Sequence, residues 1–94
     1  MADFIMLMHD DAAADGDWGA YLTWLRASGL FQGGSSIGGG KTFRKDGVTK
    51  PVTQHITGYL RFEADDIAQV EALVAGNPVF EHGGTVEIRE LPKD

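Results

Sequence analysis

The chain has 94 residues, of which 14 are acidic and eight are basic, so its formal net charge is −6. An apolar fraction of 43% with 23% charged residues is ordinary for a globular domain and excludes a disordered or collagen-like chain. The acidic balance argues against a nucleic-acid partner, because phosphate backbones repel a negative domain. No apolar run approaches the roughly 20 residues of a membrane-spanning helix. We expect a single domain over residues 1–94, with no nucleic acid and no membrane as partner.

The sequence contains no cysteine, which excludes disulfides and thiol chemistry. This composition fits the reducing conditions of the cytoplasm. Residues 1–4 place no basic segment ahead of an apolar one, so we expect no signal peptide. The expected location is therefore cytoplasmic.

The first part of the chain predicts a strand and then a helix. The continuous apolar run over residues 4–8 is typical of a strand buried on both faces. A helix is expected at about residues 17–28, with Asp15 or Asp17 as its cap and Gly29 at its end. Its apolar side chains recur at helical spacing: Trp18, Tyr21, Leu22 and Leu25.

The middle of the chain predicts a strand and an accessory hairpin. A strand that begins at Leu30 loosens into a glycine-rich turn, which predicts a bulge or a mobile flap over a pocket. Two short arms, 41–45 and 48–52, are joined by Asp46–Gly47, a strong signal for a two-residue hairpin turn. Pro51 places the second arm at a sheet edge or outside the sheet.

The second half of the chain predicts two strands that flank a second helix. Apolar and polar residues alternate over residues 54–63 and again over residues 85–91. Asp65 or Asp66 caps the helix between them, and Gly76–Pro78 ends it. The apolar stripe of this helix is formed by Ile67, Val70, Leu73 and Val74.

This order of elements defines two split βαβ units, which build an α+β, ferredoxin-like βαββαβ fold with an antiparallel sheet. The first and third strands of that fold lie side by side at its centre. The end of the first strand therefore meets the start of the third, which brings His9 towards His55.

Two helices cover only one face of a four-stranded sheet, and we expect them on the face of Leu60 and Phe62. The first strand is apolar on both faces, with Met6 on one and Leu7 on the other. Leaving the apolar side chains of either face in water costs roughly 1.5–3 kcal/mol for each large side chain. We therefore predict a homodimer with sheet face against sheet face. The alternative is a monomer whose N-terminal or hairpin segment folds over its own sheet.

The open face of the sheet also carries ionisable and polar side chains, which a purely structural interface would not favour at its centre. An apolar floor with a few convergent polar groups is typical of a small-molecule site. We predict a small organic ligand there, bound by Thr57, Tyr59, Arg61, Glu87 and Arg89.

His9 and His55 are the candidate catalytic pair, because histidine titrates near neutral pH. Tyr59 or Arg61 would stabilise a developing enolate or carboxylate beside them. The alternative is that each imidazole is half-solvated or bonded to a backbone carbonyl at a strand end. We expect no cofactor and no metal, since the three histidines lack the spacing of a metal site.

Several segments of the sequence resemble the YCII-related proteins, and the nearest branch is the one named for its DGPF motif. They are FIMLMHDD at 4–11, LRASG at 25–29, GYLRFEA at 58–64, NP at 77–78 and GGTVEIR at 83–89. The resemblance implies a dimeric α+β barrel, the architecture of muconolactone isomerases and small cofactor-free monooxygenases. Most members of this family have no established activity.

The sequence departs from this family at its suspected acid–base pair, a histidine on the first helix and an aspartate before a proline after the second. Trp18 and Asn77 occupy those positions, and residues 50–54 replace the DGPF stretch in shortened form. Neither an indole nor an amide transfers protons at neutral pH. Two functions stay open: binding of a small organic acid or lactone with isomerase-like or lyase-like proton transfer, and a non-catalytic ligand-binding or protein-interaction module.

Overall fold

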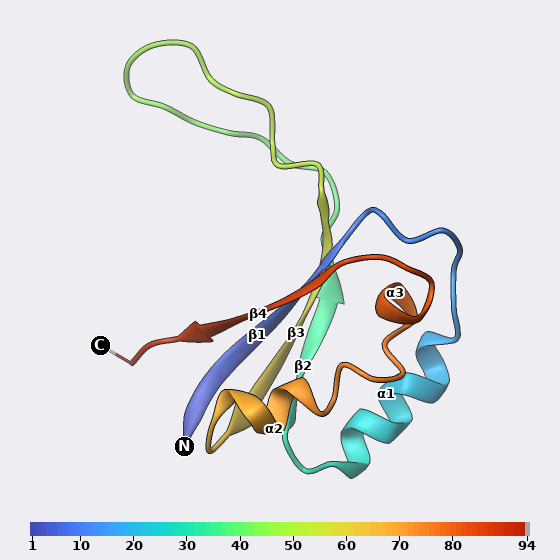
Figure 1. Cartoon of the computed structure of the whole chain (residues 1–94). Coiled ribbons are helices and arrows are strands. Elements are labelled where there is room, and N and C mark those ends of the chain that lie inside the picture. The colour runs from blue at the N-terminus through green and yellow to red at the C-terminus, as the bar shows by residue number, and fades with distance from the viewer. Residues whose placement is uncertain (94) are drawn as a thin grey trace.

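All three helices lie on one face of a four-stranded antiparallel sheet in the computed structural model, which describes residues 1–93 (Figure 1). The strand order is β2-β3-β1-β4, so the first and third strands form the centre as predicted. This is the ferredoxin-like α+β arrangement. None of the helices described is long and apolar enough to cross a membrane. The elements are β1 (Ala2–His9), α1 (Trp18–Ala27), β2 (Phe31–Ser36), β3 (Ile56–Ala64), α2 (Ile67–Glu71), α3 (Pro78–Glu81) and β4 (Val86–Leu91).

The register of the central strands places the core on the helix-covered face. Phe4 lies opposite Phe62, and Met6 lies between Leu60 on β3 and Ile88 on β4. Residues directly opposite one another in a sheet share a face, so these side chains all point towards the helices. Met6 is 0% exposed and Phe62 is 1% exposed. The predicted inward set is therefore confirmed.

Helix α1 begins and ends where its sequence signals place it. Of the two predicted caps, Asp17 is the one observed: its side chain accepts a hydrogen bond from the Ala20 N–H at 3.1 Å. Gly29 follows the helix with a φ of 78°, which only glycine adopts freely. Tyr21 and Leu25 are buried, and the Tyr21 hydroxyl donates to the Leu73 carbonyl at 2.5 Å. This bond ties α1 to the segment that follows α2.

The second helix is shorter than predicted, and an additional short helix, α3, follows where the sequence predicts only a helix end. Asp66 caps α2 and accepts from the Gln69 N–H at 3.1 Å, but α2 ends at Glu71. Asn77 then caps α3, with Pro78 in its first turn. Proline fits the start of a helix because the N–H that it lacks has no partner there. The segment that we read as a helix end is therefore also a helix start.

The predicted accessory hairpin is a long loop, residues 37–55, and none of these described residues belongs to a strand. The turn at Gly47 is present, with a φ of 88°, and the Thr42 hydroxyl donates to the Lys50 carbonyl. Residues 34–51 are all exposed, so the loop packs neither on a pocket nor on its own sheet. The predicted flap, and the alternative of a hairpin folded over the open face, are both wrong. The bulge is found within β2, next to Gly33.

Candidate functional site

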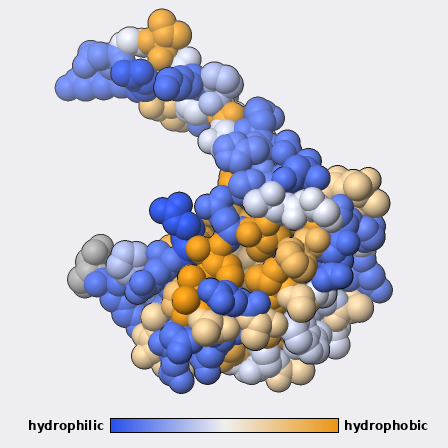
Figure 2. Space-filling view, in the orientation of Figure 1, coloured by the Kyte–Doolittle hydropathy of each residue, from blue (hydrophilic) through white to orange (hydrophobic). Residues whose placement is uncertain are grey.

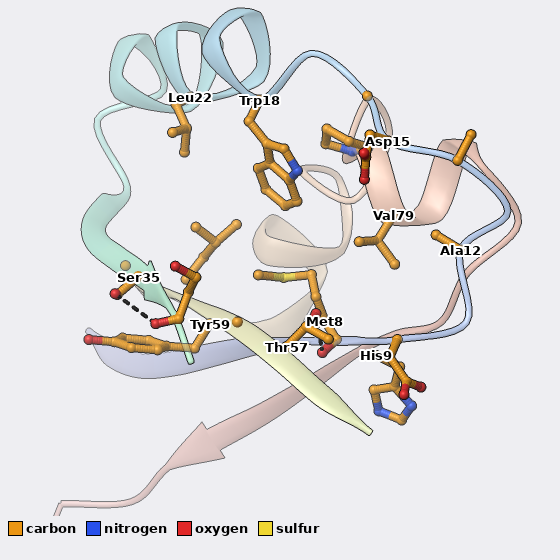
Figure 3. A pocket seen from close by; sticks show the side chains of 18 of the residues that line it. Met8, His9, Ala12, Asp15, Trp18, Leu22, Ser35, Thr57, Tyr59 and Val79 are labelled. Carbon is orange, nitrogen blue, oxygen red and sulfur yellow. Dashed lines mark hydrogen bonds between the residues drawn. The ribbon is translucent and has the colours of Figure 1, made fainter. Parts of the chain in front are cut away.

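A cavity of about 1100 Å³ opens between α1, the segment that precedes it and the β2–β3 edge of the sheet (Figure 3). Met8 and Leu60 line it with side chains that point towards the helices. The cavity therefore lies on the helix-covered face of the sheet. The sequence predicts a pocket on the open face, and this cavity lies on the opposite face.

The cavity exists because the strands beneath α1 carry little side-chain volume at this end. Gly34 lies opposite Leu60, and Ser36 lies opposite Gly58, so all four residues face the helices. Three of these four positions are glycine or serine. A Cβ atom at Gly34 would come within 2.3 Å of the Tyr59 carbonyl oxygen, so the close strand pairing requires glycine there. The large residues of α1 consequently face a hollow floor.

Trp18 forms the principal aromatic wall of this cavity. Figure 3 shows its indole projecting from α1 into the hollow, with Leu22 beside it and Val79 opposite. The Trp18 and Tyr21 rings meet edge to face, with centroids 5.9 Å apart at 71°. Because Tyr21 is buried and hydrogen-bonded, it holds the indole in place. The second tryptophan, Trp24, is outside this lining and is 47% exposed.

Polar groups border the cavity at its rim. Asp15 and Arg26 are exposed lining residues, from the loop before α1 and from its last turn. Figure 3 shows Asp15 next to Trp18. Thr57 donates a long hydrogen bond, 3.4 Å, to the Met8 carbonyl. The site thus combines apolar walls with a few polar groups at the entrance, the usual construction of a small-molecule site.

The two candidate catalytic histidines do lie together, as the topology predicted. Their ring centroids are 5.3 Å apart, and His9 Nε2 is 2.6 Å from Glu87 Oε1. The hydrogen bond from His9 lowers the pKa of Glu87, and Arg89 contributes at 3.7 Å. In Figure 3 the His9 imidazole points away from Trp18, across the sheet from the cavity. His9 therefore borders the cavity without directing its ring into it, while His55 is exposed.

Of the other predicted ligand residues, only two border the cavity. Thr57 and Tyr59 border the cavity, although Figure 3 shows the Tyr59 phenol beneath the sheet. Among the residues described, four of the predicted set lie outside its lining: His55, Arg61, Glu87 and Arg89. In residues 1–93, no three histidine or carboxylate side chains are placed to hold a metal ion.

The two positions that depart from the family's suspected pair have clear structural roles. Trp18 is part of the cavity wall. Asn77 is 0% exposed, and its side-chain oxygen accepts from the N–H groups of Val79 at 2.9 Å and Phe80 at 3.3 Å. Its Nδ2 donates to the Met6 sulfur at 3.5 Å. Trp18 therefore borders the cavity, while the Asn77 amide supports α3.

Sequence reasoning missed most of the lining residues, among them Trp18, Leu22 and Arg26 on α1. The apolar stripe of α1 was interpreted only as core. The signal that indicates a cavity is the position of this stripe above β2, whose sequence after Gln32 consists of glycine and serine only. A bulky helix face above a strand of glycine and serine cannot close-pack, and packing defects of that size are rare in protein interiors.

Comparison with known proteins supports the fold. No family model matches the sequence, and no curated protein matches it. The structure is similar to 5-chloro-2-hydroxyhydroquinone dehydrochlorinase (TftG) from Burkholderia phenoliruptrix AC1100, solved in complex with 2,5-dihydroxybenzoquinone. The TM-score is 0.57 at 16% identity, over 98% of this chain and 95% of that chain. Similarity at this identity shows a shared fold, and both chains are covered almost completely.

Proposed function

We propose that the protein binds a flat cyclic organic molecule, a small organic acid, lactone or phenol, in the cavity beneath α1. The observation that carries this proposal is the Trp18 indole held above a floor of glycine and serine. A planar ring stacks on an indole and gains contact area that a linear molecule does not. Arg26 at the rim would attract a carboxylate or phenolate.

The structural neighbour supports a ligand of this kind. That protein is a dehydrochlorinase with 2,5-dihydroxybenzoquinone, a six-membered quinone ring, bound on the fold that the two chains share. The sequence resemblance to the YCII-related proteins points in the same direction. Under this proposal residues 1–94 form one YCII-related domain of cytoplasmic location, in keeping with the absence of cysteine.

Proton transfer of the isomerase or lyase kind would need a base within reach of the bound ring. His9, Asp10 and Asp15 border the cavity, and of these the His9 ring points away from it. The second candidate is a non-catalytic ligand-binding or protein-interaction module, and the presence of Trp18 and Asn77 at the family's acid–base positions favours it. Turnover of a ligand that binds, tested with an Asp15→Asn variant, separates the two.

The proposal includes a homodimer through the open face of the sheet. Ile5 and Leu7 lie on that face and are only half-buried. Ile5 lies between Arg61 and Arg89, and its neighbour Leu7 lies beside Glu87. In a two-fold pair, the arginine row of one copy can face the glutamate of the other while the aliphatic side chains are buried.

The test is a thermal-shift titration with cyclic carboxylates, lactones and phenols on the wild type and two leucine variants. Ser36→Leu directs a large side chain into the cavity, because Ser36 faces the helices opposite Gly58. Gln32→Leu is the control on the same strand, since Gln32 is exposed and is not part of the cavity lining. A ligand at 100 times its dissociation constant stabilises the wild type by about 2.7 kcal/mol.

We expect Ser36→Leu to lose this shift and Gln32→Leu to keep it. A ligand that stabilises both variants equally would place binding elsewhere. A complete panel without any shift in the wild type would contradict the ligand proposal itself.

A further inference from the structure

The 37–55 loop extends away from the body of its own chain. Figure 1 shows it leaving the β2–β3 end of the sheet and bending away from the helices. Its base is closed by a hydrogen bond from the Ile37 N–H to the Thr57 carbonyl at 2.9 Å. The radius of gyration is 14.8 Å, against about 12 Å for a compact chain of this length. An exposed segment of this length makes few contacts that would stabilise it within one chain.

The loop and the rest of the chain carry opposite charges. Half of the eight basic residues lie inside the loop, in the ten-residue stretch 41–50: Lys41, Arg44, Lys45 and Lys50. With Asp46 as its single acidic residue, the loop has a formal charge of +3. The remaining four basic and 13 acidic residues give the rest of the chain a charge of −9.

The tip of the loop is also apolar. Phe43 and Val48 stand on either side of the Asp46–Gly47 turn, and each is 85% exposed. Figure 2 shows an orange patch on the upper side of an otherwise largely blue extension, well separated from the body. Large apolar side chains at the end of a charged extension are typical of a contact with another molecule.

We propose that the 37–55 loop is an arm that clasps the acidic body of a second copy of this chain. The inference rests on the proposed homodimer, because a partner on the open face lies on the side of the sheet that has no helices. The two-fold symmetry lets each copy's +3 arm reach the other's −9 body, so the attraction is doubled. The same −9 body repels a phosphate backbone, which disfavours nucleic acid as the occupant.

The first test places a photo-crosslinker at the tip. The chain has no cysteine, so Val48→Cys provides a unique attachment site for a benzophenone maleimide. Thr23→Cys, on the exposed side of α1, is the matched control. Irradiation of a mixture of isotopically light and heavy protein should yield mixed-isotope dimers from Val48→Cys only. Crosslinks confined within one chain, or equal yields from the two positions, would overturn the proposal.

The second test changes the charge of the arm and measures dimer dissociation by sedimentation velocity. Reversal of all four basic residues to glutamate should raise the dissociation constant roughly tenfold to a hundredfold at low salt. This difference should shrink at high salt, where the charges are screened. The control converts Lys41, Lys45 and Lys50 to arginine and should leave the dissociation constant unchanged.

The possible outcomes distinguish the proposal of an arm from the proposal of a homodimer. A dimer whose affinity survives charge reversal would overturn the arm and leave the sheet interface intact. A wild type that stays monomeric would overturn both. Charge reversal that abolishes binding of a short labelled oligonucleotide, without effect on the dimer, would overturn the arm in favour of nucleic acid.

Discussion

The two faces of the sheet are made from alternate residues of the same strands, yet they differ in content. On β1, Met6 points to the helices and is completely buried, whereas its neighbour Leu7 points to the open face and is half-buried. The helix-covered face holds the apolar core and, at one end, the cavity. The open face carries polar and charged side chains, including the hydrogen-bonded His9 and Glu87 and the neighbouring Arg89.

This difference shows where sequence reasoning about function goes astray. The ionisable residues that suggest chemistry lie mostly on the face without the cavity. The cavity arises instead from missing side-chain volume at Gly34, Ser36 and Gly58, below Trp18. A search for reactive residue types therefore identifies the open face. The cavity on the helix-covered face is found only by considering how the side chains pack.

The contrast between the helix-covered face and the open face is tested most strongly by a pair of alanine variants on β1. Met6→Ala should lower the free energy of unfolding by about 2–5 kcal/mol, because it removes a fully buried side chain from the core. Leu7→Ala should cost the isolated chain less and instead raise the dissociation constant of the dimer. Urea unfolding at several protein concentrations measures both quantities. Equal, concentration-independent losses would contradict the assignment of the two faces.

The next effect in size concerns the helix caps. Asn77→Ala should lower the free energy of unfolding by about 2 kcal/mol, since it leaves two N–H groups of α3 without their acceptor in a buried site. Asp66→Ala removes an exposed cap of α2 and should cost about 1 kcal/mol. If the Asp66 variant were the less stable of the two in urea titrations, α3 would not be the anchored helix that we describe.

Tyr21 provides an alkaline test of the helix-covered face. Burial raises the pKa of Tyr21 to about 12, above its ordinary value of 10.0. The stability from this neutral phenol is complete below pH 10 and is lost as the pH rises towards 12. Tyr21→Phe should weaken the fold at neutral pH by removing the bond to Leu73, but should flatten this alkaline loss. Tyr59→Phe, on the open face, is the control and should retain the alkaline loss.

The smallest expected effect is an acid-dependent one on the open face. The hydrogen bond from His9 lowers the pKa of Glu87 below its ordinary value of 4.5. Its contribution to stability is present above pH 4.5 and is lost as the pH falls through the folded-state pKa. Glu87→Gln should remove this part of the acid dependence, whereas Glu90→Gln should not. Chemical denaturation across the acid range would reveal the difference, and identical profiles for the two variants would argue against it.

The elements that the sequence predicts well are those with local signals. The apolar run of β1, the Asp17 cap and the helical spacing of α1 act within a few residues of one another. The approach of His9 to His55 followed from topology alone. The 37–55 loop was mistaken for a hairpin because its turn signal is genuine, while strand pairing depends on tertiary contacts that residues 38–51 do not make.

The candidate site was less accessible to sequence reasoning, because a cavity depends on what two distant segments fail to fill. The sequence correctly places Trp18 on an inward face of α1. The residues next to it in the sequence, however, do not indicate that the opposite strand carries only small side chains at this point. The register of β2 against β3 decides that Gly34 and Ser36 lie below it. That register is a property of the whole sheet and is disturbed by the bulge near Gly33.

The most direct test of the central claim is fluorine NMR of protein labelled with 5-fluorotryptophan. The chain has two tryptophans, so the spectrum should contain two resonances, and a Trp24→Phe variant assigns them. On titration with a cyclic ligand from the thermal-shift panel, we predict that the Trp18 resonance moves and that the Trp24 resonance stays in place. Saturable binding that leaves the Trp18 resonance unchanged would contradict the cavity beneath α1 as the ligand site.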